Sequence, residues 1–160
     1  MKLQYFMTDT TAGPLGVALR DGRVYFSMLS PTDAAFVESC QRKTGTCPVL
    51  ATEPEMQAQI AARVSGSASI PFDLDSCTEF QRAVLQAVSA IPRGEVRTYA
   101  QIAEAVGRPR AARAVGEVMR TNPVPVLIPC HRVIRSDASP GNYSPRPEIK
   151  RQFLSEEGAL

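Results

Sequence analysis

The chain has 160 residues, of which 44% are hydrophobic and 21% charged, as is ordinary for a globular protein. This composition excludes a disordered tail, a collagen-like repeat and a coiled coil, and no apolar run reaches the roughly 20 residues of a membrane span. The net charge is +2, but residues 76–150 carry eleven basic side chains, ten of them arginine, against six acidic ones. This half is expected to face an anion, with phosphate as first candidate, although a solvated charged surface gives the same pattern.

Residues 1–75 are expected to form an α/β unit with a β-sheet. Gly13–Arg20 has the pattern of a strand, Asp21-Gly22 that of a hairpin turn, and residues 23–28 that of a second strand. A weak helical pattern covers residues 54–64, and the small residues at 65–69 indicate a linker. We therefore expect one domain over residues 1–75 and a second over 76–160.

The second half is predicted to be mainly helical. Thr-Glu-Phe-Gln at 78–81 and Thr-Tyr-Ala-Gln at 98–101 have the form of capping boxes and predict two helix starts. Apolar residues then follow the first box at helical spacing, namely Phe80, Val84, Leu85, Val88 and Ile91. The second helix is expected to end at Gly107, and a third, rich in alanine and glycine, covers residues 110–120. This is the outline of a helix-turn-helix, although many helical hairpins with this outline bind no DNA.

A cysteine and the chain's single histidine adjoin at Pro129-Cys130-His131-Arg132. The thiolate is the nucleophilic form of cysteine, and an imidazole within reach can accept its proton. The alternative is that Cys130 is a small core residue. The other cysteines, Cys40, Cys47 and Cys77, have no paired short spacing, so the sequence favours neither zinc nor another metal. With four cysteines and no apolar leader, we expect an intracellular protein of a reducing compartment, bacterial cytoplasm or nucleus.

Several motifs stand close together in the second half. They are Pro-Arg-Gly-Glu-Val-Arg-Thr-Tyr, Ala-Ala-Arg-Ala-Val-Gly, Arg-Thr-Asn-Pro-Val-Pro and Ile-Pro-Cys-His-Arg-Val-Ile within residues 92–134, followed by Gly-Asn-Tyr-Ser at 141–144 and Phe-Leu-Ser-Glu-Glu-Gly at 153–158. At this spacing the chain resembles the O6-alkylguanine-DNA alkyltransferases, also called methylated-DNA–protein-cysteine methyltransferases. The resemblance covers about residues 76–158, and over the N-terminal part it is only topological.

The resemblance implies an α+β fold, with a ribonuclease H-like N-terminal subdomain and a winged-helix or helix-turn-helix C-terminal domain. It implies a monomeric DNA-repair protein without cofactor or membrane attachment, acting on double-stranded DNA. Such a protein moves the alkyl group of O6-alkylguanine, and of O4-alkylthymine, irreversibly to its own cysteine. Because the target atom lies inside a base pair, the nucleotide must be flipped out. Because the thioether product has no leaving group, each molecule acts once.

The resemblance also assigns the reacting groups. Cys130 matches the alkyl acceptor, His131 the base that deprotonates it through a water, and Glu157 the residue that orients His131. Tyr99 matches the tyrosine that donates to the guanine ring. Considered singly, Tyr99 is also compatible with a packed first-turn residue, and Glu157 with an acid on the C-terminal surface.

The remaining matches concern DNA and the substrate pocket. Arg113 matches the arginine that fills the space left by the flipped base, although an exposed helix arginine is more often only solvated. The small residues Ala112 and Ala114 would let their helix approach the duplex, in the minor groove for this family, and Arg120 is a further expected DNA contact. The expected pocket residues are Asn122, which braces the turn before a cysteine strand, Val133, whose carbonyl reads the exocyclic amine, and Tyr143 and Ser144, which close over the alkylated oxygen. Asn122 is also compatible with a simple Asn-Pro turn.

One segment departs from the family. After Ser144 the family usually continues with glycines, whereas this chain has Pro145-Arg146-Pro147. Proline fixes φ, so we expect a stiffer and narrower pocket rim that disfavours bulky alkyl groups.

Two other functions are compatible with the residues. One is a non-catalytic protein that binds alkylated bases, and the other is a helix-turn-helix regulator with a redox-sensitive Cys130. Cys130 argues against the first and the accompanying tyrosine, arginine and asparagine against the second.

Overall fold

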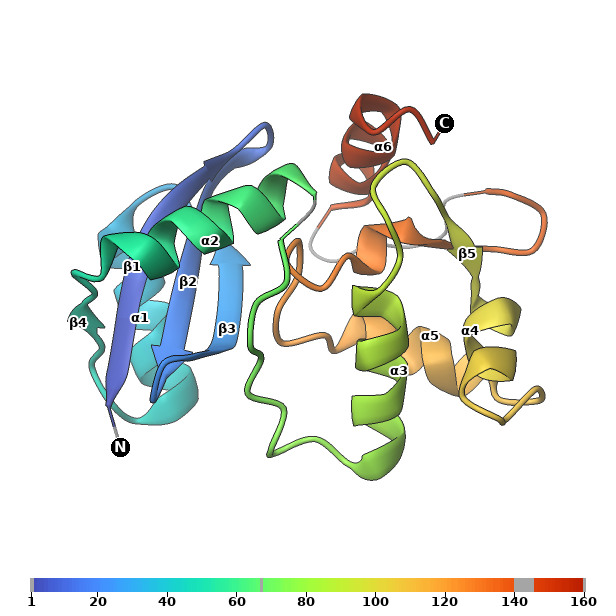
Figure 1. The fold of residues 1–160 in the computed structure, drawn as a ribbon, viewed down its shortest axis with the longest axis horizontal. Coiled ribbons are helices and arrows are strands. Elements are labelled where there is room, and N and C mark those ends of the chain that lie inside the picture. Colours follow the sequence, from blue (N-terminus) through green and yellow to red (C-terminus); the bar gives the residue numbers. More distant parts are fainter. Residues whose placement is uncertain (1, 67, 140–145, 160) are drawn as a thin grey trace. The chain divides into compact units, whose positions relative to one another are not determined.

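The computed structural model describes residues 2–66, 68–139 and 146–159, which form a mixed α+β fold (Figure 1). The chain divides into two compact units, Met1–Asp75 and Ser76–Leu160, called here the N-terminal and the C-terminal unit. Among the described residues, no helix has the length and apolar character needed to cross a membrane.

A four-stranded sheet forms the centre of the N-terminal unit. β1 (Leu3–Thr10), β2 (Gly13–Arg20) and β3 (Arg23–Leu29) are antiparallel neighbours, and the short β4 (Val49–Leu50) pairs parallel to β1, giving the order β3-β2-β1-β4. Asp21 and Gly22 both have positive φ, 50° and 81°, as the tight turn between two twisted strands requires. The predicted hairpin is therefore confirmed, whereas β1 and β4 were not predicted.

Two helices cover this sheet. α1 (Asp33–Thr44) buries Phe36 against β2, where a Cβ on Gly16 would lie 2.1 Å from the Phe36 ring, so only glycine fits there. α2 (Pro54–Ser65), which confirms the helix predicted over 54–64, buries Ile60 and lies over the other face (Figure 1). The expected linker at 65–69 contains Ser67, which lies outside the described residues.

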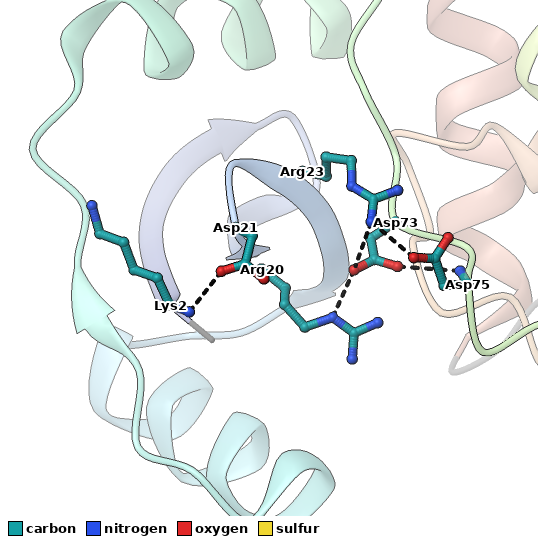
Figure 2. A network of polar contacts seen from close by, with 6 residues as sticks. All are labelled: Lys2, Arg20, Asp21, Arg23, Asp73 and Asp75. Atoms are coloured by element: carbon teal, nitrogen blue, oxygen red, sulfur yellow. Dashed lines mark hydrogen bonds and ion pairs between the residues drawn. The ribbon is translucent and has the colours of Figure 1, made fainter.

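A polar network ties the last residues of the N-terminal unit to its hairpin (Figure 2). Arg20 at the end of β2 donates from Nε to Asp73 Oδ2 at 2.6 Å, and Arg23 at the start of β3 donates to Asp75 at 2.9 Å. Backbone hydrogen bonds between Val24 and the segment that contains Asp73 add to this connection. The segment therefore lies alongside β3 like an additional short strand.

The C-terminal unit is mainly helical. Its helices are α3 (Glu79–Ser89), α4 (Tyr99–Ala105), α5 (Ala112–Arg120) and α6 (Pro147–Glu156), with a 3₁₀ turn at Cys130–Arg132 and the short strands β5 (Arg97–Thr98) and β6 (Val133–Ile134). Both predicted capping boxes are present, with Thr78 and Gln81, and Thr98 and Gln101, exchanging reciprocal hydrogen bonds. The capping-box predictions are therefore confirmed. The first helix, however, ends before Ile91, and the third begins two residues later than predicted.

The pairing of β5 with β6 positions the residues that follow the Cys-His pair. The two strands are parallel, with Arg97 opposite Val133 and Thr98 opposite Ile134. The start of α4 is thereby fixed beside the chain just after Cys130. The prediction that the cysteine itself lies on a strand was wrong, because Cys130 follows a proline and begins a 3₁₀ turn, and extended structure begins only at Val133.

Candidate active site

Cys130 lies at the start of a buried turn that is held by several backbone hydrogen bonds. Its N–H donates to the carbonyl of Ile128 at 2.7 Å, its carbonyl accepts from Val133, and the N–H of Arg132 donates to Pro129 at 2.9 Å. The Cys130 residue is 5% exposed and forms no disulfide. The thiol is therefore held by backbone geometry close to the surface of the core.

Glu157, directly after α6, is the acceptor for two side chains of this turn. His131 donates from Nε2 to Glu157 Oε1 at 2.7 Å, and Arg132 donates from Nε to both carboxylate oxygens at 3.0 Å. The side chains of Glu157 and His131 are each 4% exposed. Glu157 is thus a buried partner of His131, and the alternative of a surface acid is excluded.

Arg132 fixes this network to the rest of the unit. Besides Glu157, its guanidinium donates from Nη1 to the carbonyl of Ile91 at 2.8 Å, just beyond the end of α3. Arginine suits this place because its rigid fork reaches a carboxylate and a carbonyl at once. No role was predicted for Arg132 from the sequence, and its position inside the Cys-His-Arg motif was the available signal.

The protonation states follow from these contacts. Burial raises the pKa of Glu157, but hydrogen bonds from His131 and Arg132 outweigh it and lower that pKa to about 2. Burial lowers the pKa of His131 despite the opposing effect of Glu157, so the imidazole is neutral at neutral pH. Since a carboxylate only accepts, Nε2 carries the ring proton and Nδ1 a free lone pair. Nδ1 is buried and has no hydrogen-bond partner among the described residues.

Tyr99 opens α4 beside the cysteine. Burial raises its pKa, and the charge of a Cys130 thiolate raises it further, so the phenol keeps its proton at neutral pH. Its ring faces α5 at Gly116, where an added Cβ would lie 3.9 Å from the ring carbons. The structure thus brings Tyr99, Cys130, His131 and Glu157 into one region of the C-terminal unit.

Asn122 braces the chain between α5 and the cysteine turn. Its Nδ2 donates to the carbonyl of Ile128 at 3.1 Å, and its Oδ1 accepts from the N–H of Val124 at 2.9 Å. The enclosed loop contains Val126 with φ of 72°, a conformation that β-branched residues rarely adopt. Asn122 therefore does more than form an Asn-Pro turn, because it holds a strained loop that ends at Ile128.

The residues expected to meet DNA lie on the first and last turns of α5. Arg113 and Ala114 are exposed, Ala112 is half-buried, and the opposite face buries Val115 and Met119 in the core. Arg120 is also exposed and forms an ion pair with Glu117 on its own helix.

The remaining pocket residues are only partly described. Tyr143, Ser144 and Pro145 lie outside the described residues. Pro147 is the first residue of α6, where proline is favoured, so its place is explained by the helix start rather than by a pocket rim. The carbonyl of Val133, expected to read the base, accepts a hydrogen bond from Lys150 Nζ at 2.5 Å.

Lys150 was not predicted from the sequence to belong to this region, and its side chain is buried, with the residue only 1% exposed. Lysine is rarely buried. Its burial could have been inferred from the spacing, because position 150 shares a helical face with the buried Phe153 and Leu154.

In the described part of the chain, no group of three or more His, Cys, Asp or Glu side chains is suited to hold a metal ion.

Comparison with known proteins places this site in a family. Residues 79–159 match the family described as 6-O-methylguanine DNA methyltransferase, DNA binding domain. The chain is 35% identical to the constitutive methylated-DNA–protein-cysteine methyltransferase of Bacillus subtilis, over 97% of this chain and 96% of that one. It is 49% identical over 87 residues to the Methanothermobacter thermautotrophicus protein of that name and 50% over 80 residues to the human one. These two matches span 48% and 39% of those relatives' own lengths.

Solved structures agree over nearly the whole chain. A crystal structure of Mycobacterium tuberculosis O6-methylguanine methyltransferase matches with a TM-score of 0.78 at 29% identity, covering 98% of this chain and 93% of that one. A structure of the M. tuberculosis protein in complex with DNA matches with the same TM-score and coverage at 28% identity. The chain therefore belongs to the family of methylated-DNA–protein-cysteine methyltransferases.

Proposed function

We propose that the protein repairs double-stranded DNA by moving the alkyl group of O6-alkylguanine to Cys130, once per molecule. The observation that carries this is the buried series of Cys130, His131 and Glu157, in which Glu157 holds the histidine and leaves Nδ1 as the basic nitrogen. This is the arrangement of nucleophile, base and orienting acid that activates a weak nucleophile. Family membership supports the choice of substrate.

In this mechanism His131 Nδ1 takes the thiol proton through a bridging water. The thiolate then forms a C–S bond to the alkyl carbon, and the electron pair of the breaking C–O bond stays with the guanine oxygen. Tyr99 donates to the leaving base, which requires the phenol to be protonated, as its raised pKa provides. Glu157 and Arg132 hold the imidazole and stabilise the charge it acquires.

For DNA binding we propose that α5 enters the duplex with Arg113 filling the place of the flipped nucleotide. The first turn of α5 is exposed at Arg113, and the neighbouring side chains of Ala112 and Ala114 are small, which supports a close approach of this helix to the duplex. Arg120 would contact phosphate, which requires it to exchange Glu117 for the DNA backbone. Asn122 would fix the position of the Cys130 turn relative to α5 through its hydrogen bonds to Val124 and Ile128.

We also propose the finer description of both units. Three antiparallel strands, a helix and a fourth strand parallel to the first are compatible with a ribonuclease H-like N-terminal unit. The pair α4 and α5, with β5 and β6 beside it, supports a winged-helix C-terminal unit. We further propose that the protein acts as a monomer.

The test is the stoichiometry of transfer from a duplex that contains labelled O6-methylguanine. The expected result is a plateau at one methyl group per protein molecule, because a thioether cannot be hydrolysed. Cys130→Ser is expected to abolish transfer while keeping duplex binding. Turnover beyond one equivalent, or transfer by Cys130→Ser, would contradict the proposal, and binding of the lesion without transfer would favour the non-catalytic alternative.

A further inference from the structure

The C-terminal unit buries an ammonium group that the mechanism above does not use. Lys150 is 1% exposed, and its Nζ donates to the carbonyl of Val133 at 2.5 Å. It forms no ion pair with a carboxylate of the described residues. A buried charge without a counter-ion is costly, so its retention calls for a compensating interaction.

The groups around Lys150 come from each element packed against it. From α4, the ring of Tyr99 lies 5.8 Å from Nζ, within cation–π range. From the 3₁₀ turn, Cys130 as a thiolate raises the pKa of Lys150, while Lys150 in turn disfavours a charged His131. After β6, the positive charge of Arg135 lowers the pKa of Lys150. Among these groups, the one that becomes an anion during the reaction is the Cys130 thiol.

We propose that Lys150 is a positioning residue for alkyl transfer, whose ammonium is the counter-ion of the Cys130 thiolate and whose hydrogen bond holds the Val133 carbonyl. This inference rests on the proposed function for its reaction, but the ion pair itself does not depend on the substrate. When the thiol proton passes to His131, the sulfur keeps the electron pair, and the Lys150 ammonium is held nearby by the carbonyl of Val133, the residue whose N–H closes the turn on Cys130. Burial lowers the pKa of Lys150 to about 8, which leaves the group mainly protonated at neutral pH.

The first test is the pH dependence of Cys130 alkylation by iodoacetamide, followed on the Cys130 peptide by mass spectrometry. Iodoacetamide reacts with thiolates, so the midpoint of the rate profile reports the thiol pKa. We expect Lys150→Met to raise this midpoint by about one pH unit, since a neighbouring cation favours the thiolate. Lys150→Arg should restore part of the shift, and Arg151→Met, an exposed cation on the same helix, should leave the midpoint unchanged.

A structural role alone predicts a different outcome. Lys150→Met fills the same volume without the charge and is expected to be as stable to heat as the parent protein, or more so. A folded Lys150→Met with an unchanged midpoint would overturn the proposal, even if transfer from DNA became slower. If Lys150→Met raises the midpoint but the parent protein transfers no alkyl group from alkylated DNA, the ion pair is supported and the proposed substrate is refuted.

The second test observes Lys150 directly and needs no variant of it. The chain has three lysines, so the side-chain signals of the ¹³C-lysine-labelled protein are few enough to assign and titrate by NMR. We expect Lys150 to titrate at lower pH in Cys130→Ser than in the parent protein, because the thiolate stabilises the ammonium. Equal titration midpoints in the two proteins would overturn the proposal.

Discussion

In the described part of each unit, a buried carboxylate accepts hydrogen bonds from basic side chains, and the two carboxylates differ in what surrounds them. In the N-terminal unit, Asp73 is held by Arg20 at 2.6 Å and Arg23 at 3.7 Å, and these arginine side chains are 23% and 41% exposed (Figure 2). In the C-terminal unit, Glu157 is held by His131 and Arg132, whose side chains are 4% and 8% exposed.

We interpret the Asp73 network as structural and, under the proposed function, the Glu157 network as part of the reacting site. The Arg20–Asp73 contact joins two segments of the N-terminal unit, and among the described residues the hydrogen bonds of Asp73 involve no nucleophilic side chain, so we expect it to act on stability. The Glu157 network ends at His131 Nδ1, a buried acceptor without a partner in the described part of the chain, next to a cysteine. We therefore expect ion pairs of similar length to have different roles, because different groups lie next to them.

Removing the charge from each carboxylate should have the largest contrasting effects. Glu157→Gln is expected to slow methyl transfer by about 100-fold, because the imidazole loses its orienting and charge-stabilising partner. Asp73→Asn should leave transfer from free O6-methylguanine within about twofold while lowering the thermal stability of the protein by about 1–3 kcal/mol. Single-turnover rates with the free base and thermal unfolding measure both. Similar rate losses in the two variants would remove the proposed distinction.

Within the C-terminal unit, substitutions should distinguish residues needed for alkyl transfer itself from residues needed to flip the nucleotide out of the duplex. Arg113→Ala is expected to slow repair in duplex DNA by at least about tenfold, because flipping a base costs a few kcal/mol. Reaction with free O6-methylguanine needs no flipping and should be unchanged. Glu157→Gln serves as the matched control, since it should impair both reactions alike. An equal loss on both substrates for Arg113→Ala would mean that this arginine supports the fold.

Lowering the pH should remove the stabilising effect of the Glu157 hydrogen bonds over a defined pH range. Its pKa is lowered in the folded protein to about 2 from the ordinary value of 4.5, so its stabilising effect is complete above pH 4.5 and is lost as the pH falls towards 2. Urea unfolding between pH 6 and pH 2 should show this loss, and Glu157→Gln should reduce it. If the variant and the parent protein lose stability in parallel, the hydrogen bonds to Glu157 do not stabilise the folded state.

The smallest effect is expected at Pro145 and Arg146. A rim stiffened by proline should accept methyl better than benzyl, so replacing Pro145-Arg146 by Gly-Gly should raise the benzyl rate a few-fold more than the methyl rate. Pro147 is kept, because it begins α6. Equal single-turnover rates for O6-methylguanine and O6-benzylguanine in the parent protein would contradict this expectation.

The local features were predictable from residue patterns, whereas the contacts over long separations were not, and the contact of Glu157 with His131 was expected only from the family resemblance. The hairpin at Asp21-Gly22 and both capping boxes depend on residues within four positions, so their patterns predicted them. The extended form assumed for Cys130 failed because proline and the bonds to Ile128 impose a turn. Arg132 and Lys150 depend on partners 25 and 17 positions away, which periodicity alone does not identify.

The central claim is that Cys130, activated through His131 and Glu157, is the group that accepts the alkyl group. Peptide mass spectrometry after incubation with an O6-methylguanine duplex tests this most directly, because Cys40, Cys47 and Cys77 serve as internal controls in the same sample. The expected result is the added mass of one methyl group on the Cys130 peptide alone, with restored guanine in the DNA. Restored guanine with an unmodified Cys130, or methylation of another cysteine, would contradict it.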